Sequence, residues 1–263
     1  MNALPVVFMS DYGLGDEFVG VCHIVMANAG VEQVIDLTHS VAPQDVFHGA
    51  IVLSEAVQFM PRECVYLAVV DPGVGGSRRS VAIETEVGAY LVGPDNGLLS
   101  LAWEALGSAA RVAEITSGDV MLSPVSATFH GRDIFAPAAA HLATGMALDD
   151  IGPALDPASL RSITIPSPLT ASWAVGAEVL SVDRFGNVQL NVRPRDLETS
   201  GISGALVVDG RNLPLVLTFS DVGEGEAAAI FDSRGWLALI VNRGSAAETF
   251  GLATGSRVSL SRG

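Results

Sequence analysis

The chain has 263 residues with a formal net charge of −15, and all 14 of its basic residues are arginine. Without lysine it cannot form the Schiff base of pyridoxal-phosphate enzymes or class I aldolases, and it lacks the lysine of P-loop and kinase-type phosphate sites. The acidic balance argues against general nucleic-acid binding and favours a cationic or neutral small molecule as ligand.

The first part of the chain alternates short β-branched runs with helical stretches. Residues 64–70 contain no internal polar residue, as expected for a strand covered on both faces of a sheet. This alternation of expected strands and helices predicts an α/β layered domain with a mainly parallel sheet over residues 1–155. The expected strands are 5–9, 34–37, 64–70, 80–84 and 89–92, with a hairpin turn at 85–88, and the expected helices are 16–28, 45–59, 98–106 and 134–144.

A stretch rich in Pro and Ser then predicts a linker over residues 156–172. Beyond it, short strands follow at regular spacing with Gly-containing turns between them. This pattern predicts a small β-barrel domain over residues 173–263. The expected strands are 177–182, 187–192, 205–208, 213–218, 227–231, 237–241 and 257–260.

The cysteines and the first residues bear on location. Cys22 and Cys64 stand in apolar surroundings without a C-x-x-C motif, so we expect core thiols and a reducing cytoplasm. The start of the chain has no positively charged region, and no apolar run approaches the ~20 residues of a membrane span. We therefore expect a cytoplasmic protein without signal peptide or membrane span.

Two glycine-containing loops follow expected strands. Residues 10–16 (SDYGLGD) lack the third glycine of a dinucleotide fingerprint, and their aspartates would repel a pyrophosphate but suit ribose hydroxyls or an ammonium. Residues 71–79 (DPGVGGSRR) place Asp71 at a strand end, where Arg78 or Arg79 could fold back onto it. A helix-capping turn and a surface ion pair are the purely structural alternatives for these two loops.

A histidine beside a glycine precedes the last expected helix of the first domain. His130 in the segment FHGRD is placed to relay a proton or donate a hydrogen bond. No two histidines show metal-ligand spacing, so we expect no catalytic metal. No cofactor is expected either. Structural roles are expected for His23, His39, His48 and His141.

Two turns in the second half carry side chains that suit a nucleoside or amino-acid ligand. Residues 183–187 (DRFGN) and 231–235 (FDSRG) supply an aromatic face, an amide, carboxylates and arginine forks. Each also contains a glycine, so a purely structural turn is the alternative.

Taken together, six segments in the same order resemble the S-adenosyl-L-methionine hydroxide adenosyltransferase family, relatives of the fluorinase and chlorinase enzymes. The resemblance implies an α/β domain with a smaller β-barrel, and a homotrimer with sites between subunits. It also implies attack of water or hydroxide at the ribose C5′ of S-adenosyl-L-methionine, giving adenosine and L-methionine. The matching segments are SDYGLGDEFVG, VVDPGVGGSRRSVA, GPDNGLLS, FHGRDIFAPAAAHLA, VDRFGNVQLN and FDSRGWLALIVNRGSAA.

The resemblance assigns roles to individual residues. The family's hydroxide-handling trio falls on Asp71, Arg78 and His130, with Arg78 preferred to Arg79 because the family's arginine follows its aspartate by seven positions. The remaining assignments are Asp11 to the ribose diol, Asp16 and Asp183 to the methionine ammonium, Phe185 and Phe219 to the adenine faces, Asn187 and Asn242 to the adenine edge, and Ser233 and Arg234 to the methionine carboxylate.

Two other functions stay open at this point. One is a chlorinase-type halogenase, although halogenases lack the trio, carry an extra loop in the first domain, and have an aromatic residue and a tryptophan where Gln44 and Gln189 stand. The other is a non-catalytic protein that binds S-adenosyl-L-methionine or adenosine. Neither nucleic acid nor membrane is an expected partner.

Overall fold

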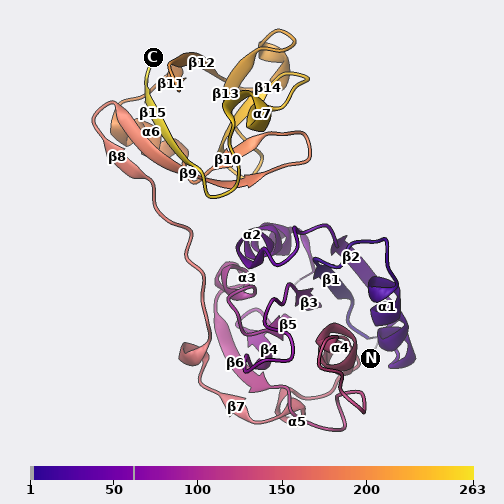
Figure 1. The fold of residues 1–263 in the computed structure, drawn as a ribbon. Coiled ribbons are helices and arrows are strands. Elements are labelled where there is room, and N and C mark those ends of the chain that lie inside the picture. The colour runs from indigo at the N-terminus through magenta and orange to yellow at the C-terminus, as the bar shows by residue number, and fades with distance from the viewer. Residues whose placement is uncertain (1–2, 62) are drawn as a thin grey trace. The chain divides into compact units, whose positions relative to one another are not determined.

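The computed structural model describes residues 3–61 and 63–263 and divides the chain into two units, residues 1–164 and 165–263 (Figure 1). The boundary falls inside the expected linker, but that segment is shorter than expected. Arg79 donates to the Ser159 carbonyl at 2.6 Å, and the Arg161 amide donates to Asp95 Oδ1 at 2.8 Å, so these residues belong to unit 1. Residues Leu169–Ala171 already form a strand of unit 2.

Unit 1 is built on a seven-stranded sheet with the order β2-β1-β3-β5-β4-β6-β7. The pairs β1–β2, β1–β3 and β3–β5 are parallel, and only β4 and β7 run against the others, so a mainly parallel sheet is confirmed. The strands are β1 (Val6–Ser10), β2 (Val34–Thr38), β3 (Val65–Val69), β4 (Ser80–Thr85), β5 (Tyr90–Pro94), β6 (Ala109–Glu114) and β7 (Ala154–Leu155).

Helices cover both faces of this sheet. The core on one face includes side chains of α1 and α4, and the core on the other includes side chains of α2 and α3, because alternate strand residues point to opposite faces. The helices are α1 (Phe18–Asn28), α2 (Val46–Ala56), η1 (Val57–Phe59), α3 (Ser100–Ala105), η2 (Gly131–Phe135), α4 (Ala136–Ala143), α5 (Leu148–Ile151) and η3 (Pro157–Ser159).

Unit 2 is a closed barrel, as predicted. Seven strands follow one another in the order β10-β14-β13-β12-β11-β15-β9, and the pairing of β9 with β10 closes the ring, with β8 added beside β9. Its elements are β8 (Leu169–Ala171), β9 (Ala174–Val182), β10 (Val188–Leu190), α6 (Pro194–Ser200), β11 (Ala205–Val208), β12 (Arg211–Val216), η4 (Phe219–Asp221), β13 (Ala227–Phe231), β14 (Leu237–Val241), α7 (Ala246–Phe250) and β15 (Arg257–Arg262).

Three smaller expectations can be compared with the structure. Cys22 and Cys64 are both buried and free, which confirms core thiols. The first helix begins at Phe18, so Asp16 and Glu17 precede it instead of forming its first turn, because the glycine-containing loop continues as a bend through residue 17. In the described part of the chain, no helix combines the length and the apolar character that crossing a membrane requires.

Candidate active site

The carboxyl ends of β1 and β3 bring two candidate aspartates to one edge of the sheet. Ser10 pairs in parallel register with Val69, so the chain leaves both strands at the same level. Asp11 follows β1 directly, and Asp71 follows β3 after one further buried residue. Ligands of open α/β sheets bind at this edge, where the loops that follow the strands can supply side chains to a site.

Asp71 and Arg78 form a buried, multiply bonded ion pair. Arg78 Nε lies 3.0 Å from each Asp71 carboxylate oxygen, and Arg78 Nη2 donates to Asp71 Oδ2 at 2.5 Å. The side chain of Arg78 is only 9% exposed and that of Asp71 only 6% exposed. Such a charge-assisted arrangement fixes the carboxylate in orientation as well as in charge.

The same guanidinium also holds His130. Arg78 Nη2 donates to His130 Nδ1 at 2.6 Å, and Arg78 Nη1 donates to Ser80 Oγ at 2.8 Å. Because arginine has only donors, His130 Nδ1 must accept, and a neutral ring then carries its proton on Nε2. The structure therefore assembles Asp71, Arg78 and His130 into one contact, with His130 as a hydrogen-bond donor through Nε2.

Tight packing brings three segments together around this trio. A Cβ added to Gly75 would lie 2.3 Å from the Ala127 carbonyl oxygen, and one added to Gly131 would lie 2.0 Å from the Tyr12 hydroxyl oxygen. Gly75 also has a positive φ of 74°, which disfavours other residues. These two glycines allow the loop after β3 and the loop after β1 to approach the segment around His130.

Burial and the Arg78 charge hold the pKa of His130 below its ordinary value of 6.5, against opposing effects of Asp71, Asp133 and the Ser126 backbone. At pH values near and below 6.5, His130 therefore binds a proton more readily in the unfolded chain than in the folded chain. The contribution to stability is fully present above pH 6.5 and is lost as the pH falls through the lower pKa of the folded state.

We expect the thermal unfolding midpoint of the wild type to fall on acidification below pH 6.5, and to fall less in His130→Gln. Melting curves of both proteins from about pH 8 to pH 5 measure this difference. His141→Gln, which replaces a histidine of α4, serves as the matched control and should follow the wild type. Identical pH profiles of wild type and His130→Gln would contradict the assignment.

Arg79 and Asp11 have other partners. Arg79 Nη2 donates to Asp95 Oδ2 at 2.5 Å, so of the two adjacent arginines it is Arg78 that contacts Asp71. Asp11 Oδ2 accepts from the backbone N–H of Gln44 at 2.8 Å, and Gln44 has a positive φ of 67°. Asp16 lies exposed in the bend before α1 and is not brought into the trio.

Every candidate residue of the second half lines one of two adjoining pockets in unit 2. Asp183, Ser233 and Arg234 line a pocket of about 420 Å³. Phe185 and Asn242 line a second pocket of about 510 Å³. Asn187 and Phe219 line both, so the pockets share a wall.

The Asp183 carboxylate stabilises the turn that contains it. Asp183 Oδ1 accepts from the amides of Phe185 and Asn187 at 2.8 and 2.9 Å, and Asp183 Oδ2 accepts from Asn187 Nδ2 at 2.7 Å. Asp183 thus builds the turn that presents Phe185 and Asn187. The Asn242 amide group donates to the Val222 carbonyl at 2.8 Å, which fixes that side chain at the pocket wall.

Asp232 organises the second turn, although the sequence singled out only the turn itself, residues 231–235, and predicted no role for this residue. Its Oδ1 accepts from the backbone amides of Arg234 and Trp236 at 2.9 and 3.0 Å, and its Oδ2 accepts from Gln189 Nε2 at 2.7 Å. Gln189 Oε1 in turn accepts from Ser181 Oγ at 3.1 Å. An Asp two residues before the turn arginine is a local signal for such a turn, but the link to Gln189 joins separate strands.

Comparison with known proteins finds relatives along nearly the whole chain. The chain is 48% identical over 261 residues to a protein of Salinispora tropica and 42% identical over 266 residues to one of Thermus thermophilus, both named (R)-S-adenosyl-L-methionine hydrolase. These alignments cover 98% of both chains in the first case, and 97% of this chain and 99% of the relative in the second. A protein of Actinoplanes sp. named fluorinase is 32% identical, with 99% of each chain covered.

A solved structure and two family models match both units. A crystal structure of an uncharacterized conserved protein from Thermotoga maritima matches with a TM-score of 0.88 and 34% identity, covering 98% of this chain and all of that one. Residues 6–152 match the model of the S-adenosyl-L-methionine (SAM) hydroxide adenosyltransferase N-terminal domain, and residues 177–259 match that of the C-terminal domain. The chain therefore belongs to the SAM hydroxide adenosyltransferase family.

Proposed function

We propose that this enzyme hydrolyses SAM to adenosine and L-methionine, as the names of its hydrolase relatives indicate for those proteins. The observation that carries the proposal is the contact of Arg78 with both Asp71 and His130, in which the Asp71 and Arg78 side chains are buried. It places the Asp71 carboxylate, a proton acceptor, beside a cationic donor, Arg78, and a neutral donor, His130. These groups can orient a water molecule and remove its proton. In the reaction, the water oxygen bonds to C5′, the C5′–sulfur bond breaks, and its electron pair goes to sulfur.

The leaving group is a neutral thioether, so it needs no general acid and the catalytic burden falls on the nucleophile. The single lone pair of His130 Nδ1 accepts from Arg78, whereas Asp71 Oδ1 accepts one bond from Arg78 and keeps a second lone pair, so the proton of the attacking water goes to Asp71 and then to solvent. Arg78 and the Nε2 proton of His130 supply positive charge and a donor for the developing hydroxide. In-line placement of oxygen, C5′ and sulfur contributes much of the remaining acceleration.

The two pockets of unit 2 support a division of the substrate. The pocket with Asp183, Ser233 and Arg234 offers a carboxylate for the ammonium and a guanidinium for the carboxylate of the methionine part. The pocket with Phe185 and Asn242 offers an aromatic face and an amide for the adenine. We propose that Asp11 holds the ribose diol and that Asp16 adds negative charge for the ammonium.

The halogenase alternative fits less well. Gln189 is buried and bonded to Ser181 and Asp232, so a polar network occupies the place where halogenases carry a tryptophan. The two hydrolase relatives described above are 48% and 42% identical over nearly the whole chain, whereas the fluorinase relative described above is 32% identical.

The family resemblance supports a homotrimer, and the two free, buried cysteines support a cytoplasmic location. We propose a homotrimer whose sites lie between the α/β domain of one subunit and the barrel of its neighbour, acting in the cytoplasm without a catalytic metal or cofactor. Sedimentation equilibrium of the purified protein tests the trimer. A monomeric mass at concentrations where the enzyme is active would contradict it.

Incubation of the purified protein with SAM, followed by chromatography of the products, tests the function. Hydrolysis gives adenosine and methionine in equal amounts, with chloride present or absent. A 5′-chlorinated nucleoside in chloride buffer would identify a halogenase instead. Unchanged SAM together with measurable binding would identify a non-catalytic binding protein.

Arg234→Ala should raise the KM for SAM about 10- to 100-fold, because a hydrogen bond to a charged group contributes about 1.5–3 kcal/mol. The dissociation constant of adenosine should change little, since the proposed adenine contacts line the other pocket. Steady-state kinetics and adenosine titration measure the two effects. Arg195→Ala, at an exposed arginine of α6, is the matched control, and equal KM values for the two variants would contradict the assignment.

A further inference from the structure

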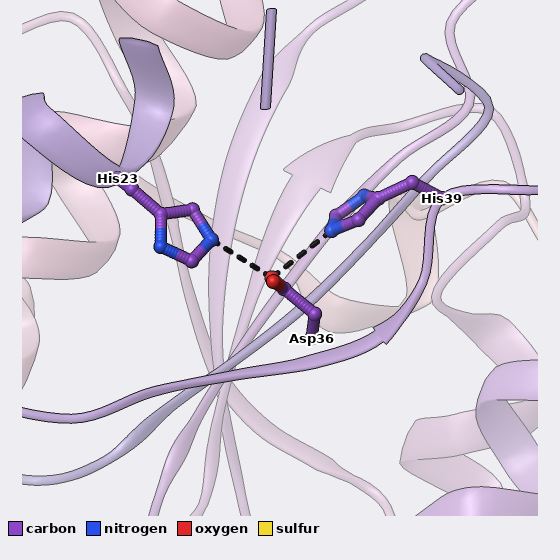
Figure 2. A group of neighbouring side chains, drawn as sticks. All are labelled: His23, Asp36 and His39. Carbon is purple, nitrogen blue, oxygen red and sulfur yellow. Dashed lines mark hydrogen bonds and ion pairs between the residues drawn. The ribbon is translucent and has the colours of Figure 1, made fainter. Parts of the chain in front are cut away.

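Two histidines and an aspartate converge on the α1 side of the unit 1 sheet, outside the trio. His23 Nε2 lies 2.8 Å and His39 Nε2 lies 3.0 Å from the same oxygen, Asp36 Oδ1 (Figure 2). The three candidate ligand atoms lie within 4.8 Å of one another. Helix α1 supplies His23, strand β2 supplies Asp36, and the residue just beyond β2 supplies His39.

The surroundings of this cluster are more typical of a metal-binding site than of an ion pair on the surface. His39 is buried, with its side chain 2% exposed, and packs against Phe8 with ring centroids 4.6 Å apart. The Asp36 side chain is 43% exposed and that of His23 is 34% exposed. One ligand is therefore anchored in the core, while the other two face a route for an ion to enter.

Ser10 supplies the outer partner that metal-binding histidines need. Ser10 Oγ lies 2.8 Å from His39 Nδ1, and a serine hydroxyl can either donate or accept. When His39 Nε2 carries its proton toward Asp36, the hydroxyl donates to Nδ1. When a metal binds Nε2, the single proton of the neutral ring moves to Nδ1, which donates to the hydroxyl, so His39 is satisfied in both states.

We propose that His23, Asp36 and His39 form a binding site for a divalent transition metal ion, with Zn²⁺ as the preferred occupant and water at the open position. Imidazole nitrogens and a carboxylate oxygen are ordinary zinc ligands, with bond lengths of about 2.0–2.2 Å. The half-exposed His23 and Asp36 side chains can make the small shifts that such bonds require. The site is structural or regulatory, because it shares no residue with the trio.

The cluster is connected to the loop that carries Asp11. Ser10 Oγ accepts from the Tyr12 amide at 3.3 Å, and the His39 carbonyl accepts from the Gly13 amide at 2.7 Å. An ion that fixes His39 would therefore also restrict the start of this loop. Hydrogen exchange at the amides of residues 10–13 can report binding at this place without any measurement of activity.

The test is calorimetric titration of ZnCl₂ into chelator-treated protein. We expect one zinc ion per chain with a dissociation constant in the micromolar range or below for the wild type. His23→Ala and Asp36→Asn should each weaken binding at least tenfold, and both are half-exposed positions whose substitution spares the core. His141→Ala is the matched control and should bind zinc like the wild type.

Three outcomes would overturn the proposal. The first is a wild type that takes up no more zinc than a His23→Ala/Asp36→Asn double variant. The second is a pair of single variants that bind as tightly as the wild type. The third is zinc-dependent protection from hydrogen exchange that falls outside α1, β2 and residues 10–13. Protection confined to those segments in the wild type, and absent in His23→Ala, supports the site.

Discussion

Asp71→Asn should lower kcat for adenosine release about 100- to 10,000-fold, the range that loss of a positioned proton acceptor produces. Asparagine keeps the shape of the side chain and one oxygen for Arg78, but its amide cannot take the proton of the attacking water. The dissociation constant of SAM should stay within a few-fold, because the proposed substrate contacts of unit 2 are untouched. Single-turnover product analysis and calorimetric binding measure the two quantities.

Asp119→Asn provides the comparison for a neutralised aspartate, since Asp119 is exposed in a turn of unit 1. It should retain the wild-type kcat. Circular dichroism must show that Asp71→Asn is folded, because neutralising Asp71 leaves Arg78 buried without its counterion. A folded Asp71→Asn variant that releases adenosine at the wild-type rate would eliminate Asp71 as the proton acceptor.

Arg78→Lys should lower kcat about 100-fold even though the charge is retained. One ammonium cannot reproduce the bonds of the guanidinium to both Asp71 oxygens, Ser80 and His130, because those bonds depend on a planar, branched group. The variant therefore separates the geometry of the site from its charge. Steady-state kinetics with SAM measure the loss.

The neighbouring arginine offers a control at the next position of the chain. Arg79→Lys should keep kcat near the wild-type value, because Arg79 is bonded to Asp95 and Ser159 instead of Asp71. A larger loss of kcat in Arg79→Lys than in Arg78→Lys would mean that the wrong arginine has been assigned to the trio.

The two-domain architecture was predictable because its signals are local. The uniformly apolar run of β3 and the regularly spaced strands of the barrel can be recognised from consecutive residues. Strand β6 was missed because its sequence, AARVAE, is partly exposed and short of β-branched residues, so its place in the sheet depends on pairing with β4.

The candidate site could be predicted only in part. Arg78 and His130 are separated by 52 positions, and family resemblance, not spacing, brought them together in the prediction. The cluster of His23, Asp36 and His39 was not predicted, because its members come from α1 and the end of β2. These two elements come together only when the helix packs on the sheet. The Asp232–Gln189 link likewise crosses between strands.

The π-helical turn η2 has a consequence for the length of the chain at this point. His130 immediately precedes it, and the Ala136 amide bonds to the Gly131 carbonyl five residues back, one more than in an α-helix. Removing one residue from 131–135 would restore α geometry and rotate His130 by about 100° around the helix axis relative to α4. The one extra residue in this turn therefore sets the rotational position of His130 about the helix axis and directs its imidazole toward Arg78.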